Sequence, residues 1–508
     1  MKINLFDENK RKIVYDILNI FYEASEIEFG ENGDIKILED KIIFKDLSYT
    51  YNDNYDLKAT LYNILVKETG YESPWGMLTG SKPSKLLQKY SPDELKEKYF
   101  ISDDKLGLLI DVKNEQDKLS FDENNYNLYI NIPFCPTRCS YCSYPTLVGA
   151  HHDRSSYIDT LCQELDMIAL PKDLASIYIG GGTPSYLSHK DLERLLAKVK
   201  ERFSSFEYIF EAGREDTLDE EKLELLKDYG VTGISLNPQT FNERVVRSVG
   251  RSYDFDHFLK MYEKALDLGF VINMDFIVGL VGEDAKTFAN NFQILEKFGP
   301  DNITFHALAS KVGSKYRENN KMGSIKDALI ISDAIKKFTE KNSYKPYYLY
   351  RQKNIISNLE NVGYQKNNTA QHYNIAINEE LENIVGLGMN ANSKLMDGEK
   401  YRNPRNLRDY LDNIDRIVEE KNLIIRDYKN TRKIWLLLSS VLFKKLINQP
   451  NVGYLIFDFI IGPSLLTFFH AVGIIYDKFA VLVGINHKNM AKESKYSLVY
   501  RNYEWTFF

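Results

Sequence analysis

Cysteine and tryptophan are scarce in this chain of 508 residues, which has four of the first and three of the second. Four cysteines in so long a chain exclude a disulfide-stabilised fold, because such frameworks occur in short, cysteine-rich chains. Neither sign of charge dominates, since 65 Lys and Arg stand against 72 Asp and Glu, a net charge of −7. This balance excludes the basic footprint of a nucleic-acid-binding protein.

From the beginning of the chain we do not expect export. Its first twenty residues, MKINLFDENKRKIVYDILNI, are charged throughout and have neither a long apolar core nor a cleavage site of small residues. We therefore expect a cytoplasmic protein. In a reducing compartment, clustered thiols are typical of metal ligands or redox centres.

One long apolar run occurs near the other end, from Val452 to Tyr476. It is long enough to cross a bilayer, which takes about 20 residues. Asp458, His470 and the pair Gly462-Pro463 argue against a membrane helix, because a charge at mid-membrane is costly. A small buried core, a segment that contacts a membrane and a poorly folded extension all remain open for this tail.

The rest of the chain divides into regions of different texture. The first mixes short β-like runs with helical ones and predicts an α+β domain. The second alternates short β-like runs regularly with helical runs. The third is polar and mainly helical. The predicted division is 1–125 for the α+β domain, 126–320 for the alternating region, 321–425 for a helical C-terminal domain and 426–508 for the apolar tail.

The alternating region predicts the fold class, α/β. Six runs rich in β-branched and aromatic residues are each followed by an amphipathic segment such as KDLERLLAKVKERF; they are NLYINI, ASIYIG, FEYIFEA, GISLN, VINMDFIVG and NITFHAL. This spacing is typical of βαβ units and a parallel sheet. Six units fit a partial (β/α)6 barrel better than a closed eight-stranded one. In parallel barrels the chemistry lies at the carboxyl ends of the strands.

Three of the four cysteines come directly after the first predicted strand. Cys135, Cys139 and Cys142 form the pattern C-x3-C-x2-C. Three thiolates on one loop can hold three irons of a [4Fe–4S] cluster and leave the fourth iron open for a small molecule. The alternative is a structural zinc site completed by His151 or His152. The fourth cysteine lies within a helical run and is typical of a buried apolar residue.

A second motif ends the second predicted strand. The sequence IYIGGGTPS places Gly180, Gly181 and Gly182 before Thr183 and Pro184. Glycines at a strand end let the backbone approach a ligand closely, although such a run is also found in tight turns.

The two motifs in this order resemble the radical S-adenosylmethionine (SAM) superfamily, whose signature has an aromatic residue before the last cysteine, here Tyr141. Within it, the chain is similar to the HemZ-type coproporphyrinogen dehydrogenases, relatives of oxygen-independent coproporphyrinogen III oxidase. The resemblance covers residues 10–425 and includes SPWGMLTGSKPSK, YINIPFCPTRCSYCSYP, EAGREDT, SLNPQTFN, NMDFIVGL, YLYRQKN and GLGMNANSK.

The resemblance implies a [4Fe–4S] cluster and SAM as cofactors. In that superfamily SAM binds the open iron, and an electron from the cluster cleaves it to methionine and a 5′-deoxyadenosyl radical. The SAM contacts that it implies are Tyr141, Gly180, Gly181, Gly182, Thr183, Glu211, Gln239, Arg251, Asp275, Gly279 and Leu280. Helix capping by Glu211 or Asp275, a loop contact by Gln239 and a solvated surface charge at Arg251 are the alternatives.

The resemblance also implies a reaction. The radical would remove hydrogen from the propionate side chains of coproporphyrinogen III, which would lose CO2 to form the vinyl groups of protoporphyrinogen IX. Tyr129 matches a tyrosine of the oxidases and is the candidate catalytic residue. A substrate with four carboxylates needs cations, for which Arg214, Arg351 and Lys394 are candidates. The electron donor would be a flavodoxin or a ferredoxin. The alternatives are a heme-trafficking protein, or a radical SAM enzyme for another tetrapyrrole.

The chain departs from the established oxidases at several positions. Tyr144 stands where they have a fourth cysteine, and Asn131 where they have a histidine. Tyr253 replaces a histidine, the sequence GLVG (279–282) stands where they have GLPG, and asparagines interrupt GLGMNANS. The first two departures are shared with HemZ-like chains.

Overall fold

The computed structural model describes residues 1–22, 24–31, 33–79, 82–319 and 322–447. Met1–Tyr428 form one compact unit and Lys429–Phe508 a second. The apolar run from Val452 to Tyr476 lies outside the described residues. Within the ranges that are described, no helix is long and apolar enough to cross a membrane.

The chain begins with a small five-stranded sheet. Its strand order is β2-β1-β3-β4-β5; β1 is parallel to both neighbours, and the last three strands are antiparallel. The apolar sides of two helices cover it, with Ile3, Ile17 and Leu61 fully buried between them. The elements are β1 (Lys2–Leu5), α1 (Arg11–Phe21), β2 (Glu28–Phe29), β3 (Ile35–Ile37), β4 (Lys41–Phe44), β5 (Leu47–Thr50), α2 (Asn54–Thr69), α3 (Pro92–Tyr99) and α4 (Asp103–Gln116).

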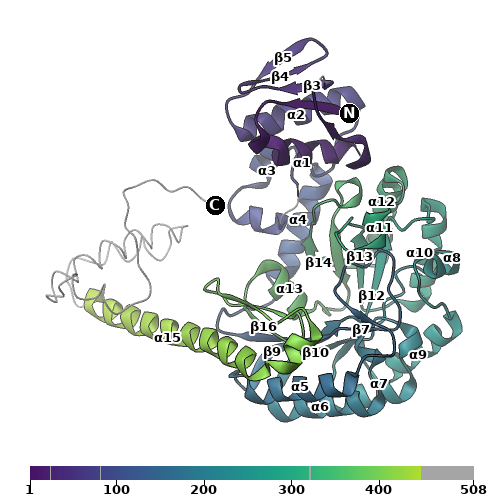
Figure 1. The fold of residues 1–508 in the computed structure, drawn as a ribbon, viewed down its shortest axis with the longest axis vertical. Coiled ribbons are helices and arrows are strands. Elements are labelled where there is room, and N and C mark those ends of the chain that lie inside the picture. Colours follow the sequence, from purple (N-terminus) through teal and green to yellow (C-terminus); the bar gives the residue numbers. More distant parts are fainter. Residues whose placement is uncertain (23, 32, 80–81, 320–321, 448–508) are drawn as a thin grey trace. The chain divides into compact units, whose positions relative to one another are not determined.

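Six parallel strands, joined by helices, form the central part of a second sheet (Figure 1). They lie in the order of the sequence, as in a partial (β/α)6 barrel, and each of the six predicted runs is one of them. The strands are β6 (Tyr126–Ile132), β9 (Asp173–Gly181), β10 (Ser204–Glu211), β11 (Gly233–Ser235), β12 (Val271–Val278) and β13 (Asn302–Ala307). The α/β partial barrel predicted from the sequence is therefore confirmed.

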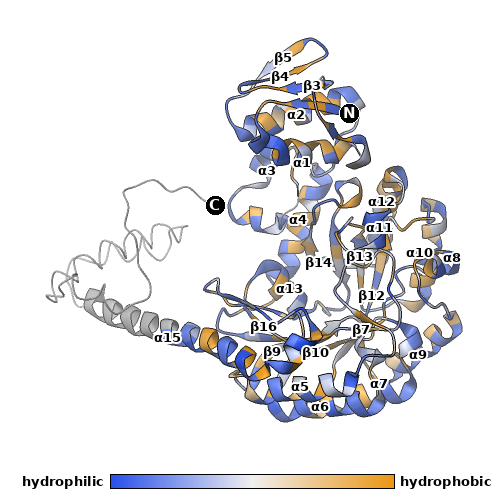
Figure 2. Cartoon of the chain, in the orientation of Figure 1, coloured by the Kyte–Doolittle hydropathy of each residue, from blue (hydrophilic) through white to orange (hydrophobic). Residues whose placement is uncertain are grey.

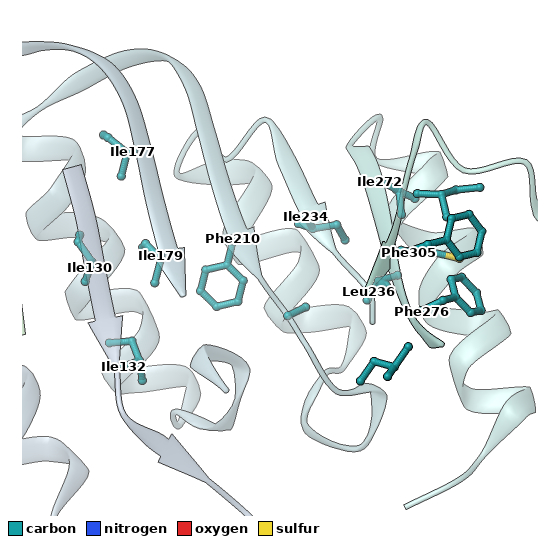
Figure 3. Packing of buried hydrophobic residues seen from close by; sticks show 14 of the residues in the cluster. Ile130, Ile132, Ile177, Ile179, Phe210, Ile234, Leu236, Ile272, Phe276 and Phe305 are labelled. Carbon is teal, nitrogen blue, oxygen red and sulfur yellow. The ribbon is translucent and has the colours of Figure 1, made fainter. Parts of the chain in front are cut away.

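The strands alternate between an apolar outer face and a polar inner face. In β6, Leu128, Ile130 and Ile132 are fully buried. Figure 3 shows Ile130 and Ile132 beside apolar residues of the neighbouring strands, such as Ile177 and Phe210. The residues between them are Asn127, Tyr129 and Asn131, and the amide of Asn127 accepts a hydrogen bond from the hydroxyl of Ser176 on β9. Because side chains alternate along a strand, the polar set lines the inner face, here called the lumen.

Amphipathic helices cover the outer face. In α6, Leu192, Leu195, Leu196 and Val199 are fully buried against the strands, and charged residues occupy the opposite side. Figure 2 shows the same alternation of hydrophobic and hydrophilic residues along the outer helices. These helices are α5 (Arg154–Met167), α6 (His189–Arg202), α7 (Glu220–Asp228), α8 (Glu243–Ser248), α9 (Phe255–Asp267) and α10 (Ala285–Phe298).

The rest of the first unit extends the sheet at both edges. Helices hold more residues of this region than strands do, as predicted, but it also contributes strands: β15 pairs antiparallel with β13, β14 pairs antiparallel with β15, and β16 pairs in parallel with β6. The domain boundaries proposed from the sequence stay predictions. The elements are α11 (Lys315–Glu318), α12 (Ile325–Lys341), β14 (Lys345–Tyr350), β15 (Asn361–Gln365), α13 (His372–Glu379), β16 (Asn383–Leu387), β17 (Asn392–Lys394), β18 (Lys400–Arg402), α14 (Leu407–Asp412) and α15 (Ile414–Ile447), which continues beyond Tyr428 into the second unit.

Helix α13 packs against the inner side of the barrel. The carboxylate of Glu207, on β10, accepts hydrogen bonds from the backbone N–H groups of His372 and Tyr373 at 2.7 and 2.8 Å. The ring of Tyr373 stacks on Tyr178 of β9 at 4.7 Å between centroids. The first turn of α13 is therefore capped by a side chain of β10, because the Glu207 carboxylate accepts hydrogen bonds from N–H groups that have no partner within the helix.

Candidate functional site

The cysteine loop follows β6, at the carboxyl end of the first barrel strand. Cys135, Cys139 and Cys142 are free thiols and half-buried, and the hydroxyl of Thr183 lies 3.4 Å from the sulfur of Cys135. Burial raises the pKa of the Cys135 and Cys142 thiols, and the positive charges of Arg214, Arg138 and Lys311 offset this only in part. Iron would supply further positive charge, so the donor set fits a metal cluster.

The glycine motif lies against this loop. The backbone N–H of Gly182 donates to the carbonyl of Ile132 at 2.8 Å, and the N–H of Thr183 donates to the carbonyl of Phe134 at 2.8 Å. A Cβ on Gly182 would lie 2.7 Å from the Phe134 carbonyl and 3.1 Å from the sulfur of Cys135. The glycines are therefore required for close approach between the second strand and the cysteine loop.

Arg251 lies under the same loop and is not a surface charge. Its side chain is only 4% exposed, and its guanidinium donates to the carbonyl of Gly213 at 2.8 Å. It also interacts with Tyr141 and Glu215, and these neighbours keep its pKa raised. Tyr141 and Arg251 were both predicted to contact SAM, and the structure brings them together.

Two predicted SAM contacts lie on the lumen side of neighbouring strands. The carboxylate of Glu211 accepts a hydrogen bond from the N–H of Gly181 at 3.3 Å, and Asp275 accepts one from Asn273 at 2.8 Å. Burial, together with the charge of Asp275, raises the pKa of Glu211 to about 7. Neither carboxylate caps the following helix, whose cap residues are Asp219 after β10 and Asp284 after β12.

The remaining predicted SAM contacts lie in loops at the strand ends. Gln239 has a left-handed backbone, with φ of 66°, and its backbone pairs with Asp275 and Ile277 beside β12. Gly279 also has positive φ, and a Cβ there would lie 2.8 Å from Ile356. Leu280 is fully buried. The contacts of these residues with SAM stay predictions.

Tyr129 belongs to a triangle of hydrogen bonds at the mouth of the lumen. Its hydroxyl lies 2.9 Å from the hydroxyl of Tyr144, and both lie within 3.2 Å of the amide oxygen of Asn131. The backbone N–H of Tyr144 donates to the sulfur of Cys142 at 3.4 Å. Two of the residues that depart from the oxidases, Tyr144 and Asn131, thus contact each other and the candidate catalytic tyrosine, and Tyr144 also contacts a cysteine of the cluster loop.

The three cations proposed for the substrate lie in different surroundings. Arg214 is near the cysteine loop, where it pairs with Asp216 at 2.6 Å and donates to Thr137 at 2.8 Å. Lys394 is over a third exposed and pairs with Glu380 at 2.6 Å. As substrate contacts, both stay predictions.

Arg351 has a structural environment. Its buried guanidinium donates to the carbonyls of Leu78, Asn358 and Leu359 and lies over the ring of Trp75. Burial lowers the pKa of this arginine to about 10. These contacts leave little of the guanidinium for a substrate carboxylate, so its proposed substrate role stays a prediction without geometric support.

Sequence reasoning missed part of the lumen. The ring of His306, on β13, has its Nδ1 3.2 Å from the hydroxyl of Tyr350 and its Nε2 3.6 Å from the carboxylate of Asp275. The signal was present, because Thr304 and His306 alternate with apolar residues in NITFHAL and therefore share the polar face.

The comparisons with known proteins agree with this geometry. The family model described as "Radical SAM superfamily" matches residues 129–294. The protein "Oxygen-independent coproporphyrinogen-III oxidase-like protein HemZ" of Bacillus subtilis (strain 168) is 31% identical over 486 residues, which is 82% of this chain and 96% of the relative. The chain belongs to the HemZ family of radical SAM proteins.

Two further similarities extend the family. "Heme chaperone HemW" of Buchnera aphidicola subsp. Schizaphis graminum (strain Sg) is 23% identical over 349 residues, 64% of this chain and 87% of the relative. The solved structure of coproporphyrinogen III oxidase (HemN) from Escherichia coli has a TM-score of 0.50 at 22% identity and covers 58% of this chain and 70% of that chain. At that identity the likeness shows the fold.

As a radical SAM protein the HemZ-family chain uses a [4Fe–4S] cluster and SAM. The cluster that the family uses takes the place of the zinc site considered from the sequence. That Cys135, Cys139 and Cys142 hold this cluster stays a prediction.

Proposed function

We propose that this HemZ-family protein is a radical SAM enzyme that converts propionate side chains of coproporphyrinogen III to vinyl groups, giving protoporphyrinogen IX in heme biosynthesis. The observation that carries the proposal is the match to HemZ over nearly the whole length of that relative. A cytoplasmic location, and an electron donor such as a flavodoxin or a ferredoxin, belong to the same proposal.

The residues of the site suit the binding of the two cofactors. Cys135, Cys139 and Cys142 would hold the cluster, and the glycine strand end offers its backbone beside them. The buried guanidinium of Arg251 would receive the carboxylate of SAM. When bound, the cluster and SAM supply the radical chemistry that removes hydrogen from an unactivated carbon.

The inner face of the barrel offers polar and aromatic side chains next to that chemistry. It carries Asn127, Ser176 and Asn273 instead of a packed apolar core, and the tyrosines 129, 178 and 373 stack on one another beside the cluster loop. Flat aromatic surfaces bind flat or bowl-shaped rings through their faces. The Tyr129 hydroxyl, held by Tyr144 and Asn131, would orient the substrate next to the cofactors.

A second candidate function is the binding and transfer of heme. It is supported by the relatives named heme chaperones, which this chain matches over more than half its length. A third is radical chemistry on another tetrapyrrole, and the three share the cofactor site.

One anaerobic experiment separates these candidates. The protein is reconstituted with iron and sulfide and reduced, SAM is added, and 5′-deoxyadenosine and CO2 are followed with and without coproporphyrinogen III. Deoxyadenosine and CO2 that both depend on the porphyrinogen would support the decarboxylase. Slow deoxyadenosine formation that the porphyrinogen leaves unchanged would refute it and favour heme binding, which absorption titration with hemin would then measure. The variant Cys139→Ala is the control, because two thiolates do not hold the cluster.

A further inference from the structure

Three segments that are far apart in the sequence meet around the cysteine loop. The N–H of Ser140 donates to the carbonyl of Val249 at 2.9 Å, and the carbonyl of Ser140 accepts from the N–H of Tyr316 at 3.0 Å. The guanidinium of Arg138, between two of the cluster cysteines, donates to the carbonyl of Gly313 at 2.9 Å. The cluster loop is thus held between residues 243–251 and 311–318.

These segments gather positive charge. Beside the buried Arg251, they carry six cations, here called the basic patch: Arg138, Arg244, Arg247, Lys311, Lys315 and Arg317. The nearby carboxylates include Glu243, which pairs with Arg247 at 2.9 Å, Asp284, which interacts with Arg244, the buried Glu283 and Glu318. The cations therefore outnumber the carboxylates here, in a chain whose net charge is −7.

Ion pairs with carboxylates neutralise little of the patch. Within the part of the chain that the structure describes, five of its six cations form no ion pair with a carboxylate, and Arg247 is the exception. Val312, between Lys311 and Gly313, is 87% exposed, the highest value among the large hydrophobic residues that are exposed in the described ranges. An apolar residue within a charged rim is typical of a protein-docking surface.

We propose that the basic patch is the docking surface for a small acidic redox protein, carrying a flavin or an iron–sulfur centre, that delivers the electron to the cluster. In each transfer the donor is oxidised by one electron and the cluster is reduced by one. The inference rests on the radical SAM assignment within the proposed function, and it is independent of which tetrapyrrole reacts.

The location favours a protein over the substrate as occupant. Cations that flank the cysteine loop bring the donor to the cluster by a short path, whereas the substrate must reach Tyr129 in the lumen. Opposite charges on the two surfaces accelerate encounter, and salt weakens this steering. A negatively charged donor would therefore reduce the cluster fast at low ionic strength and slowly at high ionic strength.

The test is a charge reversal that leaves the cluster loop intact. The double variant Lys315→Glu/Arg317→Glu changes two patch side chains for which the structure gives no hydrogen bond or ion pair. The control Lys12→Glu/Lys190→Glu makes the same change of net charge at exposed positions on α1 and α6. Stopped-flow absorbance follows reduction of the reconstituted cluster by the hydroquinone of a bacterial flavodoxin, at several salt concentrations, and by a small uncharged photoreductant.

The patch variant should accept electrons from flavodoxin about tenfold or more slowly at low salt and lose the salt dependence, since steering changes association rates by 10- to 1000-fold. The control should behave as wild type, and all three proteins should react equally with the photoreductant. The neutral variant Lys315→Gln/Arg317→Gln should be reduced by flavodoxin at a rate between those of the wild type and the charge-reversal variant. It tests the proposal even if the charge reversal disturbs folding.

Equal flavodoxin rates for wild type and both patch variants at every salt concentration would overturn the proposal. An unchanged flavodoxin rate with a raised KM for coproporphyrinogen would also overturn it and assign the patch to the substrate. Failure of the proposed function is a different result, because the porphyrinogen would then stay unreacted while flavodoxin reduced the cluster normally.

Discussion

The hydroxyls of Tyr129 and Tyr144, 15 residues apart in the chain, lie 2.9 Å from each other, and the amide oxygen of Asn131 lies within 3.2 Å of both. Asn131 is fixed in turn, because its amide N–H donates to the carbonyl of Met389 at 2.6 Å. The amide oxygen therefore faces the phenols, and the protons of both phenols are used within the triangle. The remaining lone pairs offer acceptors to a ligand with N–H groups, such as a porphyrinogen.

Tyr144→Phe should lower kcat/KM for the porphyrinogen about 2- to 10-fold, the value of one neutral hydrogen bond. The backbone N–H of Tyr144 still donates to Cys142, so the absorption spectrum and iron content of the cluster should not change. Tyr208→Phe is the matched control, because this buried hydroxyl on β10 has no hydrogen-bond partner in the described structure. Loss of the cluster in Tyr144→Phe would contradict the positioning role.

Gly181→Ala should destabilise the protein by about 2 kcal/mol or more, because overpacking and a strained backbone add. Gly181 has φ of 119°, and a Cβ there would lie 2.1 Å from the amide oxygen of Asn131. Gly107→Ala, in α4, has nothing within 4 Å and should stabilise the protein by about 0.5–1 kcal/mol. Urea unfolding measures both, and equal free energies of unfolding would refute the close approach.

Glu283 should make stability depend on pH. The residue is 5% exposed, one of its carboxyl oxygens has no hydrogen-bond partner in the described structure, and burial raises the pKa of the carboxyl from 4.5 to about 7. The folded state therefore holds the proton more tightly than the unfolded state. The contribution of this carboxyl to the free energy of unfolding is complete below pH 4.5 and is lost as the pH rises to about 7.

Glu283→Gln removes this dependence. Relative to the variant, the wild type should lose about 3 kcal/mol of its free energy of unfolding across that range, at about 1.4 kcal/mol per pKa unit. Unfolding of the two proteins by urea at several pH values gives the difference. A difference that does not change with pH would show that this carboxyl is ionised in the folded protein.

Lys421→Met should destabilise the first unit by about 3–5 kcal/mol, because it leaves a buried carboxylate without its partner. The ammonium of Lys421, 1% exposed, lies 2.6 Å from the carboxylate of Glu164, which is fully buried. The double variant Glu164→Gln/Lys421→Met should recover part of the loss, since the uncompensated charge is gone. Thermal unfolding of the three proteins checks this, and additive effects would refute the coupling.

The sequence by itself determined the barrel strands and the cluster. The alternation of apolar and polar residues has a period of two, so it marks each strand and also which side chains share a face. The three cysteines are close in the sequence and therefore close on one loop in any fold. Local patterns of this kind can be recognised without the tertiary structure, because they depend only on residues that are neighbours in the chain.

Only the tertiary structure decided which distant residues meet. The contact between Tyr144 and Asn131, the burial of Arg251 and the carbonyl ligands of Arg351 depend on how loops from different strands pack. The sequence shows that Arg351 is a cation, but its neighbours Leu78 and Trp75 are more than 270 residues away. Such contacts arise from the packing of whole elements, and no local pattern encodes them.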